Sequence, residues 1–217
     1  IIYLHQDINN RYNQYYTDNT NILNTEIENT YFNVKIRQTD FALVKENIIA
    51  KRYTIVNGNK LDLDLSFLVR SKLYSNDNNM VSGKVIDNGL IQYNHDFSFS
   101  IFANKDISGH RINDVESCFR EAVLTDKDYI GMSNDSAVSY NLGQLKSGDQ
   151  IDFTLFIYIE NNNNIKNMEE LEEKIENYKK IDVNKEYTQV KKYWTNYLEK
   201  HDGLNLRENS NKLVNDR

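Results

Sequence analysis

Proline is absent from the 217 residues of this chain, and cysteine occurs once, as Cys118. A single cysteine excludes an intrachain disulfide and a zinc site built from cysteines. It is compatible with a reducing compartment, so we expect the cytoplasm rather than secretion. Average proline usage is about 5%, so other residues must form the turns. Asparagine is abundant and tolerates the positive φ angles of tight turns.

Long apolar runs and basic patches are also lacking. A membrane-spanning helix needs roughly 18 consecutive apolar residues, and no segment approaches that length. The net charge is -6 and the charges are scattered, whereas phosphate binding requires a basic patch. We therefore expect neither a membrane nor a nucleic acid as partner. The histidines lack metal-ligand spacings, so no metal or other cofactor is predicted at His5, His95, His110 or His201.

The clearest pattern present is the strict alternation of residues 61–67, in which Leu and Phe alternate with Asp and Ser. A two-residue period predicts a strand with one buried and one wet face. Residues 48–56 predict a preceding strand. The intervening Asn57-Gly58-Asn59 predicts that the two strands form a hairpin.

Further short strands are predicted from the same alternation and from the turn residues around them. Asn88-Gly89 predicts a second hairpin, and residues 106–128 are interpreted as a loop with a helical turn near residues 116–122. The other predicted strands are residues 1–5, 12–16, 22–28, 32–36 with a continuation at 41–44, 81–86, 90–95, 97–101, 130–132, 137–140 and 151–159, with a turn at 143–149. Many short strands without helices between them favour a mainly β fold, an antiparallel sandwich or barrel.

The period becomes helical after Asn167. Asn167 and Asp182 are predicted N-caps of two helices, and Gly203 is well placed to end the second. Each helix carries an apolar stripe, with Met168, Leu171, Ile175 and Tyr178 on the first and Tyr187, Val190, Trp194, Tyr197 and His201 on the second. The sequence thus predicts a β domain over residues 1–160, a helical linker over residues 161–206 and a polar tail over residues 207–217.

Four stretches resemble the N-terminal portion of bacterial glucoamylase-like proteins, which belong to glycoside hydrolase family fifteen. They are Thr39-Asp40-Phe41, residues 85–93 (VIDNGLIQY), residues 126–133 (DKDYIGMS), and residues 193–198 (YWTNYL) with 201–204 (HDGL). The resemblance implies an antiparallel β super-sandwich of the galactose-mutarotase kind, then a helical linker, then an (α/α)6 barrel. In that barrel two glutamates catalyse inverting hydrolysis of α-glucosidic bonds.

The resemblance also implies that the catalytic barrel would follow Arg217 and that the family sandwich begins upstream of Ile1. We therefore expect a fragment that is inactive alone and contains no catalytic residue. Local carboxylate pairs are common on an acidic surface and are interpreted as ordinary, as in Glu26 with Glu28 and Glu116 with Glu121.

Sugar contact is a further possibility, because sugars stack on aromatic rings. The candidates are Tyr12, Tyr15 and Tyr16, of which Tyr15 and Tyr16 must point to opposite faces if the run is a strand. Strand propensity and half-buried packing also account for tyrosines in a β protein.

The first hypothesis is a non-catalytic N-terminal sandwich of a glucoamylase-like hydrolase that packs on the catalytic barrel of the same polypeptide. The residues predicted to form this domain interface are Met168, Leu171, Ile175, Tyr187, Val190, Trp194 and Tyr197. One alternative is a stand-alone carbohydrate-binding module with an oligosaccharide as partner. Another is an interaction scaffold whose helices mediate oligomerisation.

Overall fold

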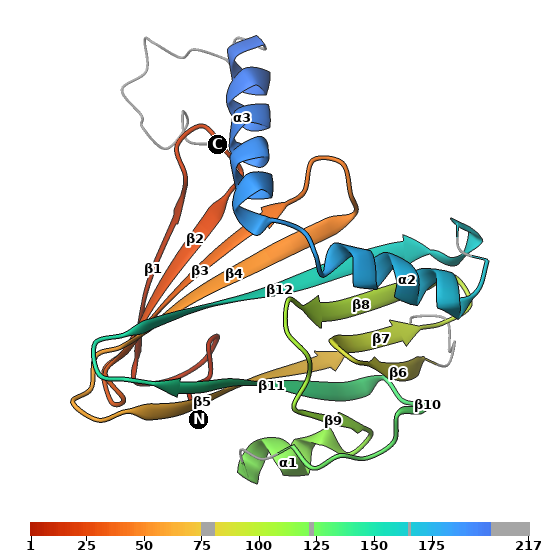
Figure 1. Cartoon of the computed structure of the whole chain (residues 1–217), viewed down its shortest axis with the longest axis horizontal. Coiled ribbons are helices and arrows are strands. Elements are labelled where there is room, and N and C mark those ends of the chain that lie inside the picture. The colour runs from red at the N-terminus through yellow and green to blue at the C-terminus, as the bar shows by residue number, and fades with distance from the viewer. Residues whose placement is uncertain (75–80, 122–123, 165, 201–217) are drawn as a thin grey trace.

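The structure is a computed structural model that describes residues 1–74, 81–121, 124–164 and 166–200. Figure 1 shows a large antiparallel sheet that faces a small one, with two helices on the opposite side of the large sheet. This is a mainly β fold with C-terminal helices, as the sequence predicted.

The two sheets differ greatly in size. The large sheet has the order β1 (Asn10–Tyr16), β2 (Leu23–Asn29), β3 (Val34–Ala42), β4 (Ile48–Asn57), β12 (Gln150–Asn161), β8 (Phe97–Ala103), β7 (Gly89–Tyr93), β6 (Ser82–Ile86), β10 (Ile130–Met132). The small sheet has the order β5 (Leu63–Lys72), β11 (Asp135–Leu145), β9 (Gly109–Ile112). The helices are α1 (Val115–Glu121), α2 (Met168–Tyr178) and α3 (Val183–Lys200), with a 3-10 turn at Asn162–Asn164.

Two apolar cores lie on the two faces of the large sheet. Strand β12 contributes to both, because Leu155 points toward the small sheet and Phe156 toward the helices. A strand buried on both faces reads as a nearly continuous apolar run, which explains the sequence of β12. The layers are therefore small sheet, large sheet and helices.

The predicted hairpin of residues 48–67 is wrong. Strand β4 pairs with β3 and β12, whereas β5 pairs with β11 in the other sheet. The connection crosses between the sheets and is held by Asn57, which is 0% exposed and donates to the carbonyls of Leu61 (2.9 Å) and Leu145 (3.0 Å). Turn-forming residues are equally suited to a crossing and to a hairpin.

The second predicted hairpin is confirmed, but its turn is displaced by one residue. Strands β6 and β7 pair with Ile86 opposite Gly89, so Asp87 and Asn88 form the turn. Gly89 is needed for another reason: a Cβ there would lie 2.1 Å from the carbonyl oxygen of Ile101 on β8.

Other boundaries also differ from the predictions. Residues 1–5 form no strand, although Ile2 and Leu4 pack against the core between the sheets. Phe32 precedes β3, which continues to Ala42 without the expected bulge. Strand β9 was not predicted. Strand β11 is longer than residues 137–140, because a bulge between Asn141 and Gly143 carries it to Leu145.

Both predicted helix caps are confirmed. The side chain of Asn167 accepts a hydrogen bond from the N–H of Glu170 at 2.9 Å, and that of Asp182 accepts from the N–H groups of Asn184 and Lys185 at 3.1 Å. His201, Gly203 and the predicted polar tail lie outside the described residues.

Candidate functional site

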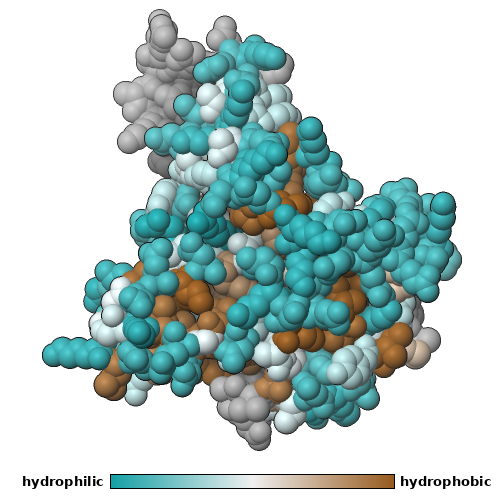
Figure 2. Space-filling model, in the orientation of Figure 1, coloured by the Kyte–Doolittle hydropathy of each residue, from teal (hydrophilic) through white to brown (hydrophobic). Residues whose placement is uncertain are grey.

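The predicted interface stripes are largely occupied within this chain. Leu171 (1% exposed), Ile175 (0%) and Val190 (0%) pack on the outer face of the large sheet, in the same core as Phe156. Met168, Tyr187 and Trp194 are half-buried against that core. Figure 2 shows mainly hydrophilic residues over the position of α2 in Figure 1. We therefore correct the prediction for Leu171, Ile175 and Val190, which attach the helices to their own sheet.

An aromatic surface remains on the second half of α3. It consists of Tyr193, Trp194, Tyr197 and Leu198, and we call it the α3 aromatic surface. Tyr193, Tyr197 and Leu198 are 46%, 44% and 41% exposed. The Trp194 ring lies 5.7 Å from the rings of Tyr193 and Tyr197, edge to face. This part of α3 extends beyond the sheets (Figure 1). It includes Trp194 and Tyr197 of the predicted interface, together with Tyr193 and Leu198, which were not predicted.

A polar network under α2 complements the apolar contacts. Glu160 on β12 is 8% exposed and accepts hydrogen bonds from Tyr158 and from Asn164 (2.9 Å), with Lys174 of α2 at 3.7 Å. Burial alone would raise the pKa of Glu160, but these hydrogen bonds and the lysine charge outweigh it and lower the pKa. The ionised carboxylate therefore stabilises the helix layer.

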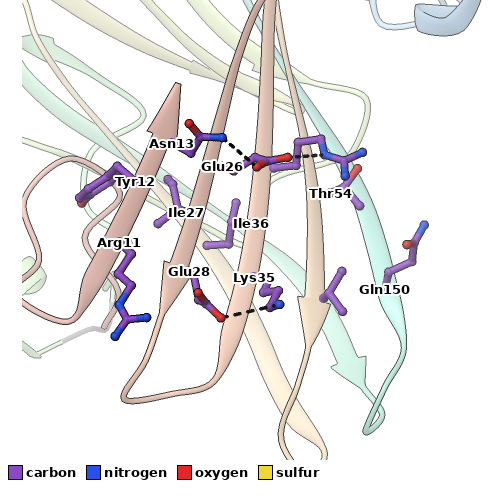
Figure 3. A pocket seen from close by; sticks show the side chains of 12 residues that line it. Arg11, Tyr12, Asn13, Glu26, Ile27, Glu28, Lys35, Ile36, Thr54 and Gln150 are labelled. Carbon is purple, nitrogen blue, oxygen red and sulfur yellow. Dashed lines mark hydrogen bonds and ion pairs between the residues drawn. The ribbon is translucent and has the colours of Figure 1, made fainter. Parts of the chain in front are cut away.

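A hollow of about 440 Å³ lies on the outer face of the large sheet, away from the helices. Cross-strand pairing places its side chains in two rows, one through Arg11, Glu28 and Lys35 and one through Asn13, Glu26 and Arg37. We call it the sheet hollow; it is lined by Arg11, Tyr12, Asn13, Glu26, Ile27, Glu28, Lys35, Ile36, Arg37, Thr54, Val56 and Gln150. Figure 3 shows how these residues gather from β1, β2, β3, β4 and the start of β12.

The charges of the sheet hollow are loosely paired. Glu28 lies 3.7 Å from Lys35, and Glu26 lies 3.8 Å from Arg37. Glu26 also accepts hydrogen bonds from Asn13 (3.4 Å) and from the hydroxyl of Tyr15 (3.2 Å). Partial burial and the charge of Glu26 raise the pKa of Tyr15. Exposed pairs of this kind contribute about 0–1 kcal/mol each.

The three candidate tyrosines divide between the faces of β1. Tyr12 and Tyr16 share one face, and Tyr15 lies on the other with Asn13. Tyr12 reaches the rim of the sheet hollow and Tyr15 touches it through Glu26, whereas Tyr16 does not line it. Tyr12 and Tyr15 therefore lie near the hollow on opposite faces of β1, and the structure does not bring the three candidates together.

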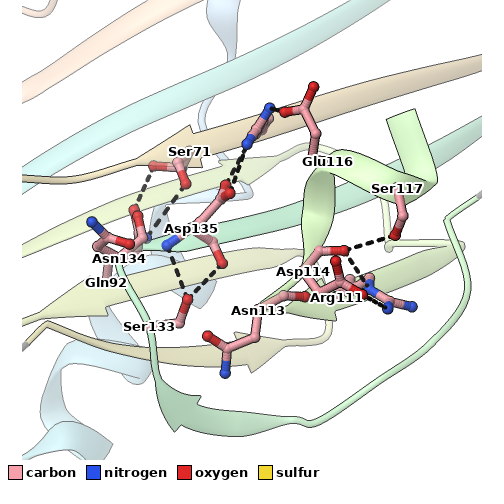
Figure 4. A network of polar contacts seen from close by, with 11 residues as sticks. Ser71, Gln92, Arg111, Asn113, Asp114, Glu116, Ser117, Ser133, Asn134 and Asp135 are labelled. Atoms are coloured by element: carbon pink, nitrogen blue, oxygen red, sulfur yellow. Dashed lines mark hydrogen bonds and ion pairs between the residues drawn. The ribbon is translucent and has the colours of Figure 1, made fainter. Parts of the chain in front are cut away.

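A second polar network ties the small sheet to the large one (Figure 4). Gln92 on β7 is 0% exposed, accepts from the Ser71 hydroxyl of β5 and donates to the carbonyl of Asn134 at 3.2 Å. Arg70 donates to both carboxylate oxygens of Asp135, at 2.8 and 2.6 Å. Hydrogen bonds that Arg70 donates to Asp135 and Glu116 raise the pKa of Arg70 despite burial. These contacts connect strands within and between the two sheets, so the network stabilises the fold.

The sequence predicted no metal site at the histidines, because their spacing does not suit metal ligands. Among the described residues no group of three or more His, Cys, Asp or Glu side chains could hold a metal ion. His110 is 3% exposed, and its ring centre lies 4.2 Å from that of Tyr129, with the ring planes tilted by 42°. Cys118 is buried and its sulfur lies 3.5 Å from the Thr125 hydroxyl. Within the described part of the chain, no helix is long and apolar enough to cross a membrane.

Comparison with solved structures now identifies the fold. Over 88% of its length, this chain matches 29% of the chain of a bacterial glucoamylase complexed with acarbose, with a TM-score of 0.69 and 13% sequence identity. It shares the antiparallel sandwich fold of that part of the glucoamylase chain. Over 82% of its length it also matches 23% of the chain of a human-microbiome protein described as a kojibiose phosphorylase (TM-score 0.56, 11% identity).

These matches establish the fold, while the family remains a prediction. The chain spans less than a third of the length of either solved protein. No protein-family model matches the sequence, and no curated protein matches it. Because the same fold occurs in a glucoamylase and in a protein described as a phosphorylase, fold alone does not select the reaction.

Proposed function

We propose that this chain is the non-catalytic sandwich domain of a longer enzyme that cleaves glycosidic bonds, with a glucoamylase-like hydrolase of α-glucosidic bonds as the first candidate. One observation carries the proposal: the fold match over 88% of this chain to 29% of the chain of a bacterial glucoamylase. In the proposal, residues 1–160 form the sandwich, residues 161–206 the linker, and a catalytic barrel follows the linker.

The partners of the carboxylates support a non-catalytic role. Glu26 and Glu28 are paired with cations on an open sheet face, and Glu116 is paired with Arg70 at 2.5 Å. Inverting hydrolysis requires two carboxylates that flank the substrate, with room for one water. The proposal therefore assigns catalysis to the following domain.

The α3 aromatic surface is the part of this chain that we assign to docking. Aromatic side chains dominate the energetics of interfaces because they bury a large area with few rotatable bonds. Leu171, Ile175 and Val190 hold α2 and α3 on the sheet, so the second half of α3 presents Tyr193, Trp194 and Leu198 from a fixed support. We propose that the catalytic domain of the same polypeptide covers this surface.

The test measures binding between this chain and the catalytic region, produced as separate fragments. Trp194→Ala is expected to weaken binding about 30-fold, since truncation of a central interface aromatic costs about 2 kcal/mol or more. Because Trp194 also contacts its own core, Leu198→Asp is the second variant, which places a charge on an exposed position. Tyr31→Ala is the matched control, at a turn tyrosine that is 73% exposed. Unchanged affinity of both α3 variants would refute the docking assignment.

A further inference from the structure

The sheet hollow is the part of the outer sheet face that the helices leave open. Residues 35, 37, 39 and 41 of β3 share this face, and Phe41 at its far end packs in the core beneath the helices. The start of α3 reaches as far as Arg52, which donates to the Asn184 side chain at 2.8 Å. Lys35, Arg37 and their neighbours lie beyond that contact. The hollow is therefore a concave surface formed by side chains from five strands.

Its side chains offer both donors and acceptors at a small net charge. Lys35 and Arg37 donate, Glu26 and Glu28 accept, and Gln150 can do both. Val56 lies between Lys35 and Gln150 in the same cross-strand row and supplies an apolar patch. Sugar rings present hydroxyls, which both donate and accept, around apolar C–H faces, so this combination suits them.

We propose that the sheet hollow binds a neutral oligosaccharide. Each carboxylate already faces a cation across the strands. Arg11 is the one further charge among the described residues of the lining, so the hollow has only a small net field with which to select a charged ligand. The ion pairs are 3.7 and 3.8 Å long, and their side chains are 43–66% exposed. Sugar hydroxyls can replace such contacts at little cost. The volume of about 440 Å³ falls within the usual range of small-molecule sites, about 300–1,000 Å³.

Glu26 is the best-positioned acceptor in the sheet hollow. Asn13 donates to one of its carboxylate oxygens and Tyr15 to the other, so two neighbours fix its orientation before a ligand arrives. Tyr15 is 43% exposed, and its hydroxyl is held beside the hollow by this bond to Glu26. Polar groups that are already held in place lose little side-chain entropy on binding. We assign the strongest sugar contact to this corner.

The inference does not depend on docking of α3, because the sheet hollow is formed by the sandwich strands alone. Isothermal titration of the 217-residue chain with maltoheptaose, kojibiose and α-mannobiose tests it directly. At least one of these sugars is expected to bind in the millimolar range or tighter, with an affinity that sodium chloride does not change. A sulfated oligosaccharide is expected to bind no better.

Two double variants with the same change in charge separate the site from the rest of the surface. Glu28→Ala with Lys35→Ala removes an ion pair inside the hollow and is expected to weaken sugar binding about tenfold or more. Asp106→Ala with Lys179→Ala removes a pair (2.5 Å) elsewhere and is expected to leave binding unchanged. The inference is overturned if none of the three sugars binds, if both double variants bind alike, or if the sulfated ligand binds more tightly. A negative result here leaves the docking proposal intact, since that assay contains no sugar.

Discussion

The helix layer is expected to be an integral part of the fold, and Ile175→Ala tests this most sharply. Ile175 is 0% exposed and lies in the core shared by α2, α3 and the large sheet. Replacing a buried isoleucine by alanine costs about 2–5 kcal/mol, as lost transfer energy and a residual cavity. We expect a loss of about 3 kcal/mol. This is a large part of the total stability of a domain, which is about 5–15 kcal/mol.

Urea unfolding can be followed with two independent probes in this chain. Trp194, the single tryptophan, reports on α3 by fluorescence, and far-ultraviolet circular dichroism reports on the strands and helices together. We expect the two transitions to coincide and Ile175→Ala to lower the midpoint by about 1 M or more. Leu198→Ala, at a position 41% exposed, is expected to change the unfolding free energy by less than about 0.5 kcal/mol. A Trp194 transition that precedes the circular dichroism transition would refute the reasoning, as would a loss below about 1 kcal/mol for Ile175→Ala.

Two further predictions concern single positions. The lowered pKa of Glu160 stabilises the fold above its unfolded-state pKa of about 4.3, and this stabilisation is lost as pH falls through the folded-state pKa. Glu160→Gln should therefore reduce stability at pH 7 and flatten its pH dependence below pH 5, measured by urea unfolding; an unchanged profile would contradict this account. Gly89→Ala would place a Cβ 2.6 Å from the Cα of Phe102 and should cost about 3 kcal/mol or more, whereas Gly143→Ala, with open space and φ +85°, should cost about 1–2 kcal/mol. Equal losses for the two glycine variants would show that close approach of β7 and β8 is not the constraint.

Local signals in the sequence predicted the elements well. The alternation in residues 151–159 located β12, and the caps Asn167 and Asp182 located both helix starts. These signals work because a strand face and a capped helix end are set by neighbours within a few residues. Because these signals depend only on nearby residues, they do not show how distant elements pack together.

Local patterns in the sequence do not show which distant strands pair with each other. Residues 57–59 fit either a hairpin or a crossing, and only the burial of Asn57 between Leu61 and Leu145 selects the crossing. Strand β9 and most of β11 were missed because they bury serine and glycine as well as apolar residues. Propensity cannot distinguish such strands from loops.

The sheet hollow shows the same limit for a site. The candidates Tyr12 and Tyr15 lie on β1, which borders the hollow, but the charged rows depend on the register of β1, β2 and β3. One sequence signal could have indicated them: Glu26 and Glu28 share a parity, and so do Lys35 and Arg37 on the next predicted strand. Pairing of those two strands places the opposite charges face to face.

The central claim is that this chain supports catalysis without performing it. The most direct test compares sugar release from maltooligosaccharides and kojibiose, with and without inorganic phosphate, by the 217-residue chain and by the longer polypeptide that we propose contains it. The account predicts turnover of at least one substrate by the longer polypeptide and none by the chain alone. Turnover by the chain alone would contradict it and direct attention to Glu26 and Glu28.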